Sequence, residues 1–99
     1  MQFIWDTNKD RTNRRDHGLD FETAARVFDD PFAYSEQDRV AFGEPRWQIL
    51  GSIGAVMVVL VAFTYWEETG GEELVRIISA RRATRHERRK YENEKRYHG

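Results

Sequence analysis

The longest uncharged stretch of the chain runs for 20 residues, from Trp47 to Trp66, in a protein in which 33% of the residues are charged. A bilayer-spanning helix needs about that length, so a membrane span must be weighed against two β-strands. Gly51 and Gly54 interrupt the stretch, and residues 55–66 are mostly β-branched, aromatic or aliphatic. Two strands joined by a glycine turn account for both features, whereas a single helix has to tolerate the glycines. We therefore predict a β-hairpin and no membrane segment.

The segments around this hairpin predict a small antiparallel sheet. Its strands are expected at residues 32–37, 46–51, 55–66 and 74–79, with a polar loop at 38–45, a tight turn at 51–54 and a polar turn at 67–73. Residues 3–5 are a short apolar run, expected to be an edge strand or an N-terminal anchor.

Helices are predicted at both ends of the chain. Asp6 and Asp20 are placed as N-caps, with Gly18 ending the first helix and Pro31 stopping the second. Near the other end, residues 84–87 match the capping box, in which a threonine and a glutamate satisfy each other's backbone amides. The expected fold class is α+β, with about four antiparallel strands, N-terminal helices and a basic C-terminal helix.

Length and composition predict one domain over residues 1–99 and exclude several kinds of site. The chain has no cysteine, so disulfides and thiolate zinc sites are excluded. Its three histidines lack metal-ligand spacing, its serines lie in no recognisable nucleophile context, and it has no glycine-rich phosphate loop. We expect no cofactor or metal. The first residues lack a secretory signal, so we expect a cytoplasmic protein.

The net charge of −1 conceals a strong asymmetry. Residues 1–80 carry 8 Lys/Arg and 14 Asp/Glu, a balance of −6, whereas residues 81–99 carry 8 Lys/Arg and 3 Asp/Glu, a balance of +5. Such a basic tail either binds a polyanion or forms a solvated, ion-paired helix. The residues expected to contact RNA or a partner protein are Arg85, Arg88, Arg89 and Tyr91. Trp47 and Tyr97 are further candidate anchors, although Trp47 also suits the core.

Two adjacent arginines are the first candidates for chemistry. Arg81 and Arg82 lie where the last predicted strand meets the capped helix, and cations beside free helix amides suit a phosphate. The alternative is one ion-paired and one solvated arginine. Glu44 and Arg46 add an acid and a cation at a strand entry, or form an exposed ion pair.

Lys9 and His17 are the remaining candidates. They are eight residues apart, about two helical turns, so both side chains can face the same way. The alternative for His17 is an interaction with the C-terminal end of the helix, just before Gly18.

Taken together, the motifs resemble those of BrnT-type toxins over about residues 3–92. The matching segments are Trp5-Asp6-Thr7-Asn8-Lys9, Asn13, His17-Gly18, Phe21-Glu22, Ala24-Ala25, Phe28-Asp29-Asp30-Pro31, Glu44, Arg46-Trp47, the run from Arg76 to Thr84, Glu87-Arg88-Arg89 and Tyr91-Glu92. Two positions depart from the family's usual pattern: Asp16 stands where a basic residue is common, and Pro45 where a polar one is common. Both departures concern local charge and loop shape.

The resemblance implies a RelE-like ribonuclease fold and translation inhibition by RNA cleavage without a metal. Such cleavage needs a base for the 2′-hydroxyl, an acid for the leaving oxygen and cations for the phosphate. We expect Arg81 and Arg82, helped by Arg46, to stabilise the phosphate. Glu44 or His17 is expected to supply acid–base catalysis.

The resemblance also implies a partner, a BrnA-type ribbon-helix-helix antitoxin. We expect two toxins to flank one antitoxin dimer, and operator DNA to be bound only through the antitoxin. The competing interpretations are a non-catalytic basic module that binds nucleic acid or protein, and a purely structural subunit of a heteromer.

Overall fold

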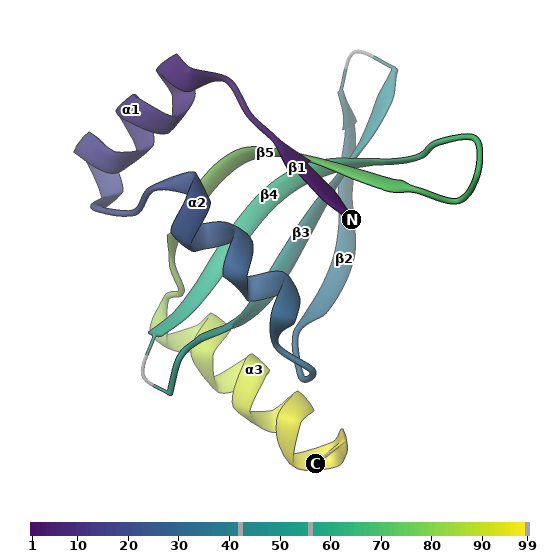
Figure 1. Cartoon of the computed structure of the whole chain (residues 1–99). Helices are drawn as coiled ribbons and strands as arrows, with labels where there is room; N and C mark the ends of the chain where they lie inside the picture. Colours follow the sequence, from purple (N-terminus) through teal and green to yellow (C-terminus); the bar gives the residue numbers. More distant parts are fainter. Residues whose placement is uncertain (42, 56, 99) are drawn as a thin grey trace.

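The computed structural model describes residues 1–41, 43–55 and 57–98. Its centre is a five-stranded sheet with the strand order β1-β5-β4-β3-β2 (Figure 1). The strands are β1 Gln2–Ile4, β2 Tyr34–Ala41, β3 Glu44–Ile53, β4 Met57–Glu67 and β5 Glu73–Arg82. The helices are α1 Thr7–His17, α2 Phe21–Ala24, the 3-10 helix η1 Ala25–Asp29 and α3 Arg85–His98. Within the described residues, none of the helices is both long and apolar enough to cross a membrane.

The α+β class and the C-terminal helix are confirmed, but the expected antiparallel sheet of about four strands is wrong in detail. A fifth strand, β1, pairs in parallel with β5, while β2 to β5 form an antiparallel meander. Parallel neighbours need a long connection between them, and here almost the whole chain lies between the two strands. The sheet is therefore mixed, and the predicted N-terminal edge strand takes its place beside the last strand.

The predicted loop at residues 38–45 is also wrong, because β2 continues to Ala41 and β3 already begins at Glu44. Gly43 lies between the two strands with a φ of 78°, a left-handed conformation that glycine adopts without a Cβ clash. An irregularity in the pairing between Gln37 and Arg39 accommodates Asp38 within the strand. Phe42, in the predicted loop, and Val56, in the predicted strand at 55–66, lie outside the described residues.

The two glycines of the uncharged stretch have different roles. Gly54 lies in the turn after β3, as predicted, and has a φ of 65°. Gly51 instead lies inside β3, where an added Cβ would come within 2.7 Å of Ala33 Cβ and 2.8 Å of a Val27 methyl carbon. The prediction of Gly51 as a turn residue was therefore wrong: its missing side chain lets η1 and the following loop pack closely on the sheet.

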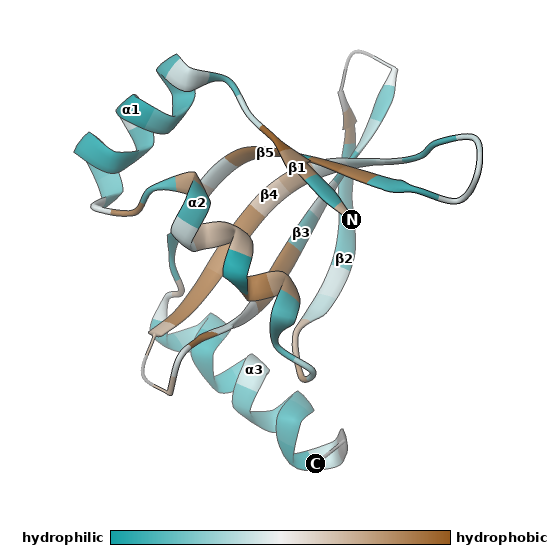
Figure 2. Ribbon diagram, in the orientation of Figure 1, coloured by the Kyte–Doolittle hydropathy of each residue, from teal (hydrophilic) through white to brown (hydrophobic). Residues whose placement is uncertain are grey.

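One face of the sheet, the core face, forms the main hydrophobic core with α2 and η1. Apolar colour runs through the middle of β3, β4 and β5, whereas α1 and α3 are mostly hydrophilic (Figure 2). The core contains α2 and η1 residues such as Phe21 and Val27 and strand residues such as Val59, Val61 and Ile77, all of which are at most 1% exposed. The second predicted helix, capped by Asp20, thus supplies the cover of this face.

The buried side-chain amide of Asn13 attaches α1 to the edge of β5. The Asn13 side-chain nitrogen donates to the backbone oxygens of Leu19 (2.7 Å) and Ala80 (2.8 Å), and its oxygen accepts from the Ala80 N–H (3.0 Å). Strand β1 pairs with β5 only as far as Arg76. At Ala80 the Asn13 side chain replaces a neighbouring strand, because it both donates to and accepts from the Ala80 backbone. It fixes α1, which carries Lys9 and His17, against the C-terminal half of β5.

Replacing Val59 by Asp is predicted to prevent folding. Val59 is 0% exposed and lies in the core on β4. An unpaired buried carboxylate costs several kcal/mol, a large part of the about 5–15 kcal/mol that holds a domain folded. Circular dichroism and thermal unfolding measure the effect. Val40→Asp on β2 is the matched control, because Val40 is 62% exposed; it should change stability by less than about 0.5 kcal/mol. A folded Val59→Asp protein would contradict the core assignment.

Candidate functional site

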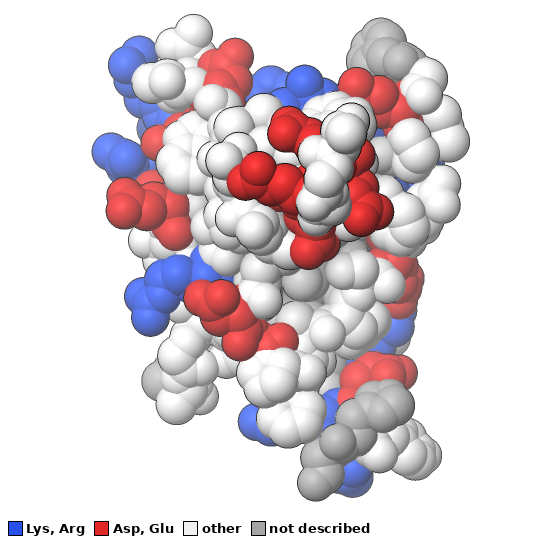
Figure 3. All heavy atoms as spheres, turned by 45° about the vertical axis from the view of Figure 1, so that its right-hand side comes forward, with Lys and Arg blue, Asp and Glu red and all other residues white. Residues whose placement is uncertain are grey.

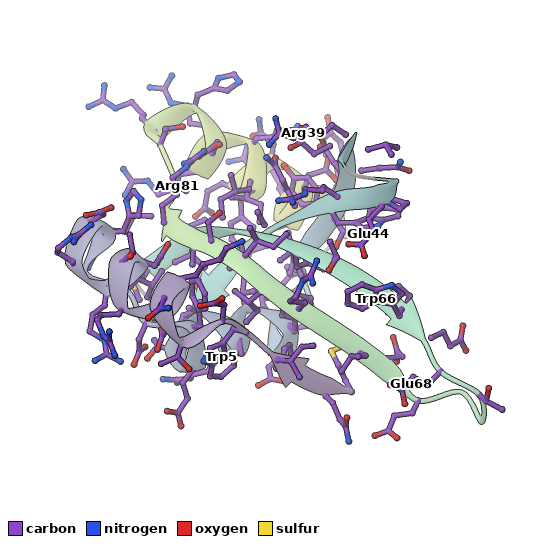
Figure 4. All side chains as sticks on the ribbon, turned by 90° about the horizontal axis from the view of Figure 1, so that it is seen from above. Trp5, Arg39, Glu44, Trp66, Glu68 and Arg81 are labelled. Carbon is purple, nitrogen blue, oxygen red and sulfur yellow. The ribbon has the colours of Figure 1, made fainter. Side chains whose placement is uncertain are left out.

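The second face of the sheet carries four arginines from three strands and is called the arginine face below. They are Arg39 on β2, Arg46 on β3, and Arg76 and Arg81 on β5. The strand register places Arg39 opposite Arg46, Thr64 opposite Arg76 and Leu60 opposite Arg81, on the side away from the buried Val75 and Ile77. Figure 4 shows Arg39, Glu44, Trp66 and Arg81 on the side of the sheet where α3 lies, and Trp5 on the opposite side.

The structure separates the two arginines that the sequence placed together. The last strand was expected to end at Ser79 but continues to Arg82, because residues 80–82 keep pairing with β4. Successive side chains in a strand point to opposite faces, so Arg81 lies on the arginine face and Arg82 on the core-face side. Arg82 there lines a surface hollow with Arg14, Asp20 and other residues. The two side chains therefore lie on opposite sides of the sheet and do not form the single phosphate site expected at the strand–helix junction.

Arg81 is held in a two-point ion pair by Glu87 of α3. Its two terminal nitrogens lie 2.7 Å and 3.0 Å from the two carboxylate oxygens. The capping box is confirmed: the Glu87 carboxylate also accepts from the Thr84 N–H, and the Thr84 hydroxyl accepts from the Glu87 N–H. The hydrogen bonds from Arg81 lower the pKa of Glu87 to about 2, against the opposing effect of partial burial. This pair thus joins the start of α3 to the arginine face.

A second ion pair crosses the sheet at the other end of the face. An Arg76 terminal nitrogen donates to the Glu44 carboxylate at 3.1 Å. The Arg76 guanidinium also lies over the Trp66 ring, 5.2 Å from its centroid. Glu44 and Trp66 therefore hold Arg76 from two sides, and the planar cation keeps a defined orientation on an exposed surface.

Arg46 differs from these two arginines. Among the described residues, no carboxylate forms an ion pair with Arg46 or with Arg39. Arg46 Nε and Thr64 Oγ1 are both buried and have no hydrogen-bond partner within the described part of the chain. Uncompensated positive charge and unused polar atoms therefore lie at the β3–β4 part of the arginine face.

Lys9 and His17 do face the same way, as their spacing predicts. Both line a hollow of about 400 Å³ between α1 and the edge of β5, which Asp16, Ile78 and Ser79 also line. Ser79 lies opposite Ala62, on the same side of the sheet as Arg81. These two candidates therefore lie beside β5 and not among the arginine-face residues Glu44, Arg46, Arg76 and Arg81.

Within the described residues, the contacts of helix α3 with the rest of the protein include the Tyr91 side chain, two ion pairs, and the cations of Lys90 and Lys95 over the rings of Tyr34 and Phe32. Tyr91 is 2% exposed and donates its hydroxyl to Asp30 at 2.6 Å; burial and this bond raise its pKa. The expectation of Tyr91 as an exposed anchor is therefore wrong. Trp47 packs against the core, whereas Tyr97 is 86% exposed. Lys90 pairs with Glu36 on β2 at 2.7 Å.

The outer side of α3 is strongly basic. Arg85, Arg88, Arg89 and Arg96 line a shared surface hollow of about 440 Å³ together with Glu92 and Asn93. The expected contact residues on this helix, Tyr91 excepted, thus form one exposed patch. In the described residues, no cluster of three or more His, Asp or Glu side chains has a geometry that could hold a metal ion.

Sequence reasoning missed Arg76 and Trp66. The sequence could have predicted the position of Arg76. It stands between Val75 and Ile77 in a predicted strand, and the alternation of side chains along a strand places it on the opposite face from them. Trp66 was expected only as the last residue of the predicted strand at 55–66, so nothing marked it as part of a site.

The Glu87 ion pair predicts a specific pH dependence of stability. Its pKa is lowered from 4.5 to about 2 on folding, so its contribution is present above pH 4.5 and is lost as the pH falls toward 2. We expect Glu87→Gln to lower the unfolding free energy by about 1–2 kcal/mol at pH 7, after allowance for the partial exposure of the pair. Denaturant unfolding at several pH values measures this. A difference between the two proteins that stays constant from pH 7 to pH 2 would contradict the assignment.

Comparison with known proteins assigns the fold to a family. The crystal structure, at 1.1 Å resolution, of the Brucella abortus ribonuclease toxin BrnT is similar to this chain, with a TM-score of 0.64 and 26% sequence identity. The similarity covers 86% of this chain and 99% of that one. No curated protein matches the sequence. A family model described as the ribonuclease toxin BrnT of type II toxin–antitoxin systems matches residues 5–87. The chain therefore belongs to the BrnT family of ribonuclease toxins.

Proposed function

We propose that the protein is a metal-independent endoribonuclease that cleaves RNA in the cytoplasm, inhibits translation and is held inactive by a BrnA-type antitoxin. The observation that carries this proposal is the arginine face, where four guanidinium groups from three strands share one surface with the Glu44 carboxylate. RNA cleavage develops negative charge on a crowded phosphate, and fixed cations stabilise that charge. The family's description as ribonuclease toxins agrees with this chemistry.

In this proposal Arg46 and Arg81 contact phosphates of the bound RNA. Arg46 supports this role because it has no carboxylate partner among the described residues. Arg81 supports it because Glu87 fixes its orientation while the side chain remains 39% exposed. A preorganised donor of this kind contributes roughly 3 kcal/mol to transition-state stabilisation.

Acid–base catalysis is assigned to Glu44 and to His17. Glu44 shares the arginine face and is the first candidate to move a proton to or from the ribose oxygens. His17, with Lys9 beside it, is the second candidate, from the hollow beside β5. Arg82 is not part of the proposed site, since its side chain lies on the core-face side of the sheet.

The antitoxin is proposed to cover the basic outer side of α3. Arg85, Arg88 and Arg89 supply an exposed cationic patch and Tyr97 an exposed aromatic ring. Charged patches speed and orient association, while aromatic anchors contribute most of the final affinity. A ribbon-helix-helix antitoxin would bind as a dimer, which gives two toxins per antitoxin dimer.

The ribonuclease assignment predicts that the protein cleaves RNA and arrests bacterial growth when it is expressed alone. Arg46→Ala should reduce the cleavage rate by roughly a hundredfold or more, because it removes an uncompensated cation from the phosphate site. Cleavage should continue in the presence of EDTA. Gel analysis of a labelled RNA, with growth curves, measures both.

Arg82→Ala is the matched control, since it removes an arginine from the opposite side of the sheet and should leave cleavage within about twofold of the unsubstituted protein. A fully active, folded Arg46→Ala protein would remove Arg46 from the site. RNA binding without any cleavage would favour the non-catalytic binding module.

The partner assignment predicts that the toxin copurifies with the product of a neighbouring ribbon-helix-helix gene as two toxins and one antitoxin dimer. Replacing Arg85, Arg88 and Arg89 together by Glu should slow association by at least tenfold and weaken its salt dependence. Mass measurement and stopped-flow binding provide the data. A toxin that elutes alone beside a folded antitoxin, or a triple variant that associates at the unchanged rate, would contradict the model.

A further inference from the structure

We propose that Trp66 and Arg76 form a nucleobase-stacking subsite at the hairpin end of the arginine face. The inference deepens the proposed ribonuclease function, on which it rests, by placing one unpaired base of the RNA beside the phosphate-contacting arginines. The ligand class is thus a single-stranded nucleotide whose base is free to stack.

The geometry of the two side chains supports a stacking role. Trp66 is half-buried at the end of β4, on the same face as Arg76 and Thr64. The Arg76 guanidinium lies 5.2 Å from the centre of the indole ring, and Glu44 binds its terminal nitrogen at 3.1 Å. Two planar π-surfaces are therefore held in fixed orientation on an exposed face, and single-stranded bases stack on both aromatic rings and guanidinium planes.

The charge around Trp66 favours a base over a phosphate. Beyond Trp66 the β4–β5 hairpin carries Glu67, Glu68, Glu72 and Glu73, and Figure 3 shows carboxylates gathered over this end of the molecule. A phosphate would be repelled there, and Glu44 already neutralises Arg76. A neutral base carries no such penalty, so the base is placed toward the hairpin and its phosphate toward Arg46 and Arg81.

The buried polar atoms next to this subsite are a second, independent observation. Thr64, which lies opposite Arg76, is 1% exposed, and its hydroxyl has no hydrogen-bond partner within the described residues. Arg46 Nε is also buried and has no hydrogen-bond partner within the described residues. Native proteins rarely leave buried polar groups unsatisfied. Two polar groups without a partner in the described residues therefore lie on the arginine face next to Trp66 and Arg76.

The test uses short single-stranded RNA with 2′-O-methyl riboses, which cannot be cleaved, and the same oligonucleotide with abasic sites. The unsubstituted protein should bind the base-containing probe roughly tenfold more tightly, the contribution of about one stacked base, and its tryptophan fluorescence should be quenched only by that probe. Trp66→Leu should bring the ratio of the affinities for the base-containing and the abasic probe close to one. Trp66→Phe, which keeps an aromatic ring, should retain most of the preference for the base-containing probe.

Tyr65→Leu is the matched control, because Tyr65 is 39% exposed on the neighbouring residue of β4 but lies opposite Val75, on the core-face side. It should keep the affinity ratio unchanged. A Trp66→Leu protein with the ratio of the unsubstituted protein, or equal affinity of the unsubstituted protein for both probes, overturns the inference. Because the probes cannot be cut, discrimination between them without any cleavage of ordinary RNA would support the subsite and refute the proposed activity.

Discussion

The carboxylate of Asp30 joins three parts of the fold, the loop after η1, strand β3 and helix α3. It accepts hydrogen bonds from the Phe32 N–H at 2.9 Å, the Ser52 N–H at 2.7 Å and the Tyr91 hydroxyl at 2.6 Å. Burial opposes ionisation, yet these bonds hold its pKa below the usual value. Through Tyr91 the same group fixes α3, and α3 in turn brings Glu87 to Arg81. The arrangement of the arginine face therefore depends on a carboxylate that is not part of it.

Local rules predicted much of the fold from the sequence. The caps at Asp6 and Asp20 and the capping box at residues 84–87 need only their nearest neighbours, and all three form as expected. The parallel pairing of β1 with β5 depends on contacts across almost the whole chain, so no local pattern contains it. Gly51 was misassigned for the same reason, because only the approach of Val27 and Ala33 explains its missing side chain.

The sequence predicted the candidate site in part. The error at Arg82 arose because the predicted end of the last strand was too early. Glu44, Arg46 and Arg81 do share one face, while Arg82 leaves it because β5 continues beyond Ser79. Where a strand ends is decided by its neighbour, here the pairing of residues 80–82 with β4, and not by its own sequence. Arg76 was within reach of strand alternation, but its stacking on Trp66 required the sheet.

Charge is distributed unevenly over the arginine face. Both arginines that β5 contributes to this face have carboxylate partners, Arg76 with Glu44 and Arg81 with Glu87. Arg39 and Arg46 have none among the described residues, so the arginines without an ion pair lie on the β2–β3 half of the face. The acidic β4–β5 hairpin closes one end and the basic helix α3 lies at the other (Figures 1 and 3). Phosphates are attracted to cations and repelled by carboxylates, so a polyanion lying across this sheet is drawn toward α3 and away from the hairpin.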